Sequence, residues 1–244
     1  MTENKMNNQI EYMKRPEVEA AFEKYNTVIL PIGATEQHGP HMPYGTDTYL
    51  AHEMSVRLAK KIKSLILPAM PFGYSWVWRD IPGSVVISVE HVKGIVKDIA
   101  HSMARNGMEK MIIINGHGAN DSALKYAVRE LSDEINMEIY YFTYPGLKEA
   151  SKHSESEKWH GMVHACELET SWLLTVYPEL CDMDKAVKEY PNDREAVKYH
   201  NSSLPMGALS NSGVFGDATK ATKEKGEVMM EELVNYMFDI LEGK

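Results

Sequence analysis

Residues 27–47 read TVILPIGATEQHGPHMPYGTD, and this stretch decides the fold. Its first part, TVILPI, is a short apolar run that predicts a buried strand despite Pro31 near its end. The remainder is polar, contains glycine and proline, and carries Glu36, His38 and Asp47. In α/β proteins ligands bind just past the carboxyl ends of the strands. The stretch therefore predicts a strand that runs into a ligand-binding loop.

Outward from this stretch, short apolar runs alternate with segments of helical periodicity. We expect further strands at 65–68, 111–114 and 138–144, and helices at 16–24, 47–63, 92–103, 124–131, 166–176 and at the end of the sequence. Strands that alternate with helices predict a three-layer α/β/α architecture with a mostly parallel central sheet. We expect residues 1–244 to form one domain. The segment 178–218 shows no assignable pattern.

The composition is that of an ordinary globular protein, with 43% apolar and 25% charged residues among 244. The formal net charge of −9 argues against a nucleic-acid partner, because phosphate-binding surfaces are normally basic. Two cysteines do not suggest a disulfide framework, and no secretory signal or membrane-length apolar run is visible. We expect a cytoplasmic protein that takes a small molecule, with no membrane or nucleic-acid partner.

The polar loops after two predicted strands carry candidate metal ligands. Glu36 and His38 alternate along an extended segment, so both side chains reach the same side while Gln37 faces away. Asp47 follows after a turn, and His117 comes just past the strand at 111–114. Carboxylate and imidazole ligands together suit Zn²⁺, Mn²⁺ or Fe²⁺ better than Ca²⁺. The carboxylate of Asp47 is able to bridge two ions, and it is also placed to cap the following helix.

A third group of histidines and acids lies at residues 159–171, WHGMVHACELETS. If a helix begins near His164, Glu167 lies one turn further on the same face. Glu169 diverges from Glu167 by about 200°, so only one of the two acids easily faces the metals. We choose Glu167 as the ligand because it shares the face of His164. A salt bridge is then an equally good explanation for Glu169. Any one of these histidines alone is more often structural, but three such clusters together favour a site.

An aromatic loop with glycine and proline, PFGYSWVWRDIPGS, occupies residues 71–84. We expect it near the mouth of the pocket because it follows a predicted strand. Trp76 and Trp78 would form a substrate wall, although packing or oligomer contacts also explain them. Arg79 and Asp80 would hydrogen-bond hydroxyls or an amide of the substrate, or pair with one another.

Taken together, these segments resemble the signatures of the creatininase (creatinine amidohydrolase) family. The matching segments are EQHGPH at 36–41 with Asp47, NGHGAN at 115–120, HACELETS at 164–171 and GVFGDA at 213–218. They span most of the chain in the expected order. The resemblance implies a three-layer α/β/α domain, two divalent metal ions per chain (Zn²⁺ or Mn²⁺, with Fe²⁺ also compatible) and often a hexameric homo-oligomer.

Carried over by position, the resemblance also implies roles for individual residues. Glu36 would bind one ion and His38 the other, and Asp47 would bridge them. His117 would be a further ligand. His164 matches a histidine near the substrate and is our candidate general acid or base, since an imidazole titrates near working pH.

Two positions depart from creatininase itself. That enzyme has a metal-binding Glu two residues after its further histidine ligand, where this chain has Ala119. It also has a catalytic Glu where this chain has Val163. We expect Glu167 to supply the missing ligand and His160 or His164 to transfer the proton. Creatinine is therefore not the expected substrate.

The expected activity is hydrolysis of an amide C–N bond in a small polar cyclic substrate by a metal-activated water. One alternative is C–C hydrolysis of a cyclic diketone such as a dehydro-inosose, a reaction of inositol catabolism, which the polar pair Arg79 and Asp80 would suit. Another is a metal-stabilised binding protein without catalysis. The ligand set argues against that alternative, because purely structural metal sites are normally closed to water.

Overall fold

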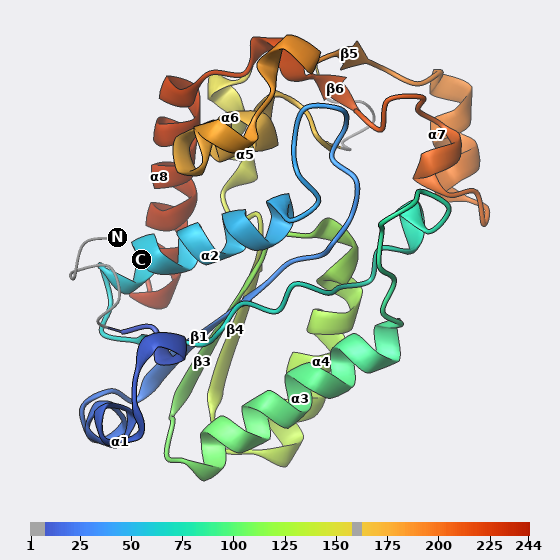
Figure 1. Ribbon diagram of the computed structural model, residues 1–244. Helices are drawn as coiled ribbons and strands as arrows, with labels where there is room; N and C mark the ends of the chain where they lie inside the picture. The colour runs from blue at the N-terminus through green and yellow to red at the C-terminus, as the bar shows by residue number, and fades with distance from the viewer. Residues whose placement is uncertain (1–7, 158–162) are drawn as a thin grey trace.

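The computed structural model describes residues 8–157 and 163–244, and its centre is a sheet of four parallel strands in the order β2-β1-β3-β4 (Figure 1). The strands are β1 (Thr27–Ile32), β2 (Leu65–Ile66), β3 (Lys110–Asn115) and β4 (Glu138–Thr143). β1 is buried along its whole length, which is why its sequence is a continuous apolar run. β1 and β3 run in register, with Ile32 opposite Asn115, so both end at the same edge of the sheet.

Helices cover both faces of the sheet, which confirms the predicted three-layer α/β/α architecture. Alternate residues of one strand serve different cores: Leu30 packs with α1, α3 and α4, and Ile29 packs with α2, α6 and α8. Figure 1 shows α3 and α4 on one side of the sheet and α2 and α8 on the other. None of the described helices has the length and apolarity needed to cross a lipid bilayer. The helices are α1 (Arg15–Lys24), α2 (Thr46–Ala59), α3 (Val89–Arg105), α4 (Asp121–Glu134), α5 (Leu147–Ala150), α6 (Glu167–Val176) and α8 (Lys223–Leu241).

Two elements are shorter than the sequence predicts. The strand expected at 65–68 pairs with β1 only through Leu65 and Ile66, and Pro68 lacks the N–H needed to continue the ladder. The helix expected to reach residue 63 ends at Ala59. Its last turn tightens instead, with Lys61 N donating to Leu58 O at 2.8 Å in the 3₁₀ pattern.

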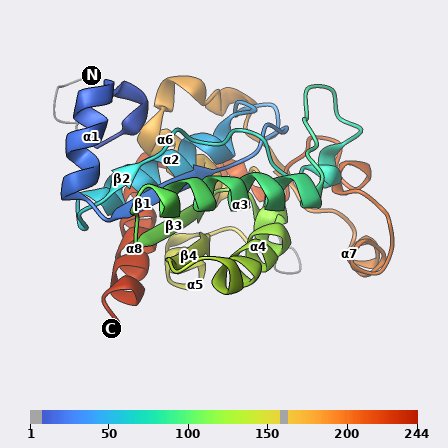
Figure 2. The ribbon, with the colours of Figure 1, turned by 90° about the horizontal axis from the view of Figure 1, so that it is seen from below.

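The segment 178–218, for which the sequence shows no pattern, holds two short strands and a helix. β5 (Lys188–Glu189) pairs antiparallel with β6 (Gly216–Asp217), and α7 (Asp193–His200) lies between them in the chain. In both views α7 stands at the opposite end of the molecule from α1 (Figures 1 and 2). Elements this short contain too few residues to show a periodic pattern of apolar residues, and the sequence therefore did not predict them.

A glycine allows α8 to pack tightly on α6. A Cβ added at Gly226 would lie 1.9 Å from Ser171 O, whereas one added at Gly94 of α3 would meet nothing within 4 Å. We expect Gly226→Ala to lower the free energy of unfolding by about 1–3 kcal/mol, as overpacking does. Gly94→Ala should raise it by about 0.5–1 kcal/mol through helix propensity alone. Urea unfolding of both variants checks this, and effects of the same sign would contradict the close helix contact.

Candidate metal centre

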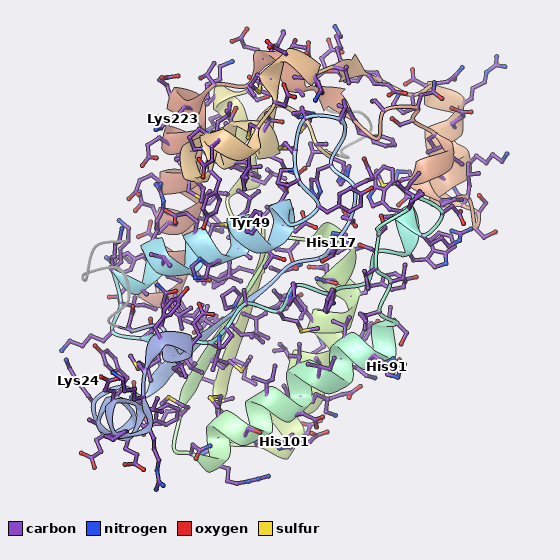
Figure 3. The ribbon with its side chains drawn as sticks, in the orientation of Figure 1. Lys24, Tyr49, His91, His101, His117 and Lys223 are labelled. Carbon is purple, nitrogen blue, oxygen red and sulfur yellow. The ribbon has the colours of Figure 1, made fainter. Side chains whose placement is uncertain are left out.

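Acids and histidines gather where β1 and β3 end at their shared edge. The loop after β1 carries Glu36 and His38, α2 carries Asp47 in its first turn, and the loop after β3 carries His117. Figure 3 labels His117 just beyond the end of β3, beside the beginning of α2. All four side chains are buried, with Glu36 and Asp47 each 1% exposed. The structure thus brings together four of the five residues that the sequence predicted as metal ligands.

Two groups of potential ligands share Asp47. One is formed by Glu36, Asp47 and His117, and the other by His38, Asp47 and Glu169. Asp47 Oδ1 lies 2.9 Å from His38 Nε2, and its Oδ2 lies 3.1 Å from His117 Nδ1. One oxygen of the carboxylate therefore faces each group, as bridging of two ions requires.

The three histidines at the cluster are oriented as metal-binding histidines usually are. A backbone carbonyl only accepts hydrogen bonds, so the ring nitrogen beside it must carry the proton. His38 Nδ1 donates to Glu36 O at 3.1 Å, His117 Nε2 donates to Tyr74 O at 3.1 Å, and His164 Nε2 donates to Gln37 O at 2.8 Å. The opposite nitrogen of each ring faces the carboxylates. Such backbone anchoring fixes the ring and leaves a lone pair for an ion.

The charges of the cluster favour bound cations. Within the described residues, the ion pairs of Glu36 and Asp47 are to histidines alone. Burial disfavours the charged imidazole, yet Asp47 still raises the pKa of His38 to about 9. The neighbouring histidines hold the pKa of Asp47 below its usual range despite burial. Buried carboxylates demand compensating charge, which protons on the histidines or divalent ions would supply. Nitrogen and oxygen donors of this kind fit Zn²⁺, Mn²⁺ or Fe²⁺.

Glu167 does not reach the cluster, and its predicted place is taken by Glu169. Glu167 Oε1 accepts from Lys225 Nζ at 2.6 Å, while its Oε2 accepts from Ser154 Oγ and the backbone N–H groups of residues 155 and 156. Burial opposes ionisation, but these donors lower the pKa of Glu167 to about 2. It acts as an anchor for the segment at 154–156.

The prediction that Glu167 is a metal ligand was wrong because it placed the start of the helix near His164. α6 begins at Glu167, not near His164, and Ala165 between them is left-handed with φ 48°. His164 instead forms a β-bridge with Phe215. His164 and Glu167 therefore share no helix face. The expected divergence of Glu169 from Glu167 holds, and it places Glu169 on the side of the cluster. Burial raises the pKa of Glu169 to about 7.

His164 lies against the cluster with its Nδ1 3.7 Å from Glu36 Oε1. Burial and the nearby His38 lower its pKa to about 4, so the ring is neutral at pH 7. The indole of Trp78 packs on the ring, with centroids 4.6 Å apart. Gln37, expected to face away, also reaches this histidine, with its Nε2 3.0 Å from His164 Nε2. The other predicted proton-transfer residue, His160, lies outside the described residues.

A cavity of about 350 Å³ opens beside the cluster. Of the four predicted substrate contacts, only Trp78 lines it. The Trp76 ring instead packs against the Arg79 guanidinium, whose carbon lies 4.0 Å from the ring centroid. Arg79 Nε lies 3.7 Å from Asp80 Oδ2, so these two solvent-exposed side chains form an ion pair with each other. The lining residues that were not among the predicted site residues are Val77, Gly118, Ala119, Tyr144, Val163, Glu169, Tyr199 and Met206. Tyr199 and Met206 belong to the segment 178–218, in which the sequence showed no assignable pattern of helices or strands.

The fold and the cluster define a class of protein, an α/β/α domain built around a buried carboxylate–histidine centre. The creatininase family model, described as creatinine amidohydrolase, matches residues 11–241. The chain therefore belongs to the creatininase family.

Curated relatives in this family are hydrolases with different substrates. The chain is 28% identical to the creatinine amidohydrolase of Pseudomonas putida, over 88% of each chain. It is 25% identical to the 3-dehydro-scyllo-inosose hydrolase of Thermotoga maritima, over 92% of this chain and 79% of the relative. It is 29% identical to the mycofactocin precursor peptide peptidase of Mycobacterium ulcerans, over 86% and 82%.

Solved structures agree with this membership. A creatinine amidohydrolase (creatininase) superposes with a TM-score of 0.80 at 26% identity, covering 96% of each chain. A mutant creatininase of the Zn–Zn type superposes with a TM-score of 0.78 at 25% identity, covering 96% of this chain and 97% of that one.

Proposed function

We propose that this enzyme hydrolyses an amide C–N bond of a small, uncharged cyclic substrate with the help of two divalent ions. The observation that carries the proposal is the pair of buried ligand groups that share Asp47. Glu36 and His117 would hold one ion, His38 and Glu169 the other, and Asp47 both. Ions bound in this way activate water and polarise a carbonyl oxygen.

The protein's own groups would orient the reactants and move a proton. Ser75 Oγ donates to Glu36 Oε2, which leaves Glu36 Oε1 facing His117 Nδ1 at 3.4 Å. His164 is neutral, and its Nδ1 lone pair is free to accept a proton at the cavity. The carbonyl of Gln37 accepts from the other ring nitrogen at 2.8 Å, which favours this orientation of the ring. We assign His164 as the general base, which would then return the proton to the leaving amine.

Loss of the His164 imidazole should slow the chemical step without removing ions. For His164→Ala we expect kcat to fall by about 10²–10⁴-fold, the usual range for a general acid or base. Metal content, measured by atomic emission, should match that of the unsubstituted protein. Loss of an ion would instead make His164 a ligand, as its proximity to Glu36 and His38 also allows.

The walls of the cavity favour an uncharged substrate with an apolar or flat ring. Away from the cluster, the described lining residues are Val77, Trp78, Gly118, Ala119, Val163, Tyr199 and Met206, whose side chains offer one hydroxyl and an indole. No lysine or arginine is among the described lining residues, so an anionic substrate would lack a partner there.

A second candidate reaction is C–C hydrolysis of a keto-inositol, which the likeness to the Thermotoga maritima hydrolase suggests. An inositol ring carries many hydroxyls and needs many hydrogen-bond partners, which these walls lack. The amide reaction is therefore preferred.

Substrate panels separate the two reactions. Metal-loaded protein should open or cleave cyclic amides that carry a flat or apolar ring, and leave keto-inositols unchanged. Asp47→Asn protein serves as the control for contaminating activities. Turnover of keto-inositols at rates above those of every cyclic amide would replace the proposed reaction with the second.

A further inference from the structure

Two residues with unusual backbone conformations surround Glu169. In the part of the chain that the structure describes, the non-glycine residues with positive φ are Tyr144 at 41° and Ala165 at 48°. This left-handed region costs an L-residue free energy because Cβ approaches the carbonyl oxygen. Such strain persists only where the surrounding structure imposes it, and it concentrates at functional sites.

Both residues donate a hydrogen bond to the same carboxylate. The Ala165 N–H donates to Glu169 Oε2 at 2.6 Å, and the Tyr144 hydroxyl donates to Glu169 Oε1 at 3.0 Å. Tyr144 comes just after β4, and Ala165 comes just before α6. Each oxygen therefore has its own donor from a different segment, which fixes the rotation of the carboxylate about its last bond.

Tyr144 also connects Glu169 with the other ligand group. Its one hydroxyl proton is shared between Glu169 Oε1 and Gly116 O, and Gly116 directly precedes His117. A Cβ at Gly116 would lie 2.1 Å from Asp47 O, so this is where the loop after β3 meets α2. One phenol group thus contacts Glu169 and the backbone carbonyl next to His117.

The phenol ring is itself held in place. It stacks on the buried indole of Trp172, with centroids 5.6 Å apart and planes 21° apart. Trp172 lies on α6, the same helix that carries Glu169. The ring and the carboxylate are therefore positioned by one rigid element, and the left-handed backbone at residue 144 is the conformation that this placement requires.

We propose that Tyr144 and Ala165 are positioning residues that hold Glu169 in the orientation needed to bind the second ion. The inference rests on the proposed function, because it takes Glu169 to be a metal ligand. Outer partners of a metal ligand typically alter metal affinity about 10–100-fold. A merely structural hydroxyl would alter stability and leave metal affinity unchanged.

Tyr144→Phe tests the proposal because it removes the hydroxyl and keeps the ring on Trp172. We expect the more weakly held Zn²⁺ ion to dissociate about 10–100-fold more readily in competition with a chelator. The visible spectrum of the Co²⁺-substituted protein should change for one of the two ions. Tyr140→Phe is the matched control, since its hydroxyl on the same sheet donates to Glu138, outside the cluster, at 2.5 Å. Equal affinities for both ions in Tyr144→Phe and Tyr140→Phe would overturn the proposal.

Two further variants separate the failure of this proposal from failure of the proposed function. If Glu169→Gln retains both ions with full affinity, the ligand assignment itself is wrong. If Glu169→Gln loses one ion and Tyr144→Phe does not, the positioning role alone is wrong. Ala165→Gly should retain both ions, because glycine adopts the left-handed region freely and presents the same N–H. Loss of an ion in that variant would overturn the role of the Ala165 amide.

Discussion

An Asp47→Asn variant is expected to lose at least one of the two proposed ions and at least about a thousandfold in rate. A divalent ion contributes several kcal/mol of stabilisation to a developing charge, and each 1.36 kcal/mol is about tenfold in rate. Asp47 is the residue shared by the two groups proposed to hold the ions, so the loss should exceed that from any other single ligand. Atomic emission on protein dialysed against a low level of Zn²⁺ gives the stoichiometry.

The side-chain amide introduced by that substitution has nearly the size of the carboxylate, and it still accepts through one oxygen. In a chelator it no longer compensates the charge on His38 and His117, so the metal-free variant should unfold at a lower temperature than the metal-free parent protein. Full occupancy by two ions in Asp47→Asn would refute the bridging role. A folded protein with no ions and unchanged activity would refute the requirement for metal.

Substitution of Glu169 is expected to have the second large effect, and substitution of Glu167, two residues before it, is the matched comparison. Glu169→Gln should lose one ion and at least about 10–100-fold in rate, since even outer partners of a ligand have effects of this size. Glu167→Gln should keep both ions, because Glu167 faces Lys225 and Ser154 rather than the cluster. Metal content of the two variants, measured side by side, decides between them. The reverse result would restore Glu167 as the ligand.

Glu167→Gln should instead lose stability, by roughly 1–3 kcal/mol for its charged hydrogen bonds. The folded-state pKa of Glu167 is depressed to about 2 from the ordinary 4.5. Its contribution is therefore fully present above pH 4.5 and is lost as the pH falls towards 2. Unfolding free energies of the two proteins should differ most near neutral pH and converge in acid. A constant difference across that range would contradict the ionised state.

The part of the site nearest the sheet was predictable from sequence because strands leave local signals. Glu36, His38 and His117 each follow a buried apolar run, and parallel strands end at one edge. Asp47 was also predictable, since it opens a helix of clear periodicity. The layer architecture follows from the same alternation of apolar runs and helical periods.

What lay beyond prediction depends on contacts between distant segments. The start of α6 is set by the left-handed Ala165 and by the bridge from His164 to Phe215, and neither leaves a local pattern. Tyr144 reaches the cavity only because its ring stacks on Trp172. The cavity residues Tyr199 and Met206 belong to elements too short to show a period.

The outlying position of α7 separates two tasks that many enzymes combine on one element. The ligands of the proposed ions lie on α2, α6 and the loops after β1 and β3, whereas Tyr199 comes from a helix at the far end of the molecule (Figure 2). Substitution of Tyr199 is expected to reshape the substrate wall while leaving the proposed ion ligands in place. Substrate specificity is thus able to change through α7, in evolution or by engineering, while the residues that bind the proposed ions stay the same.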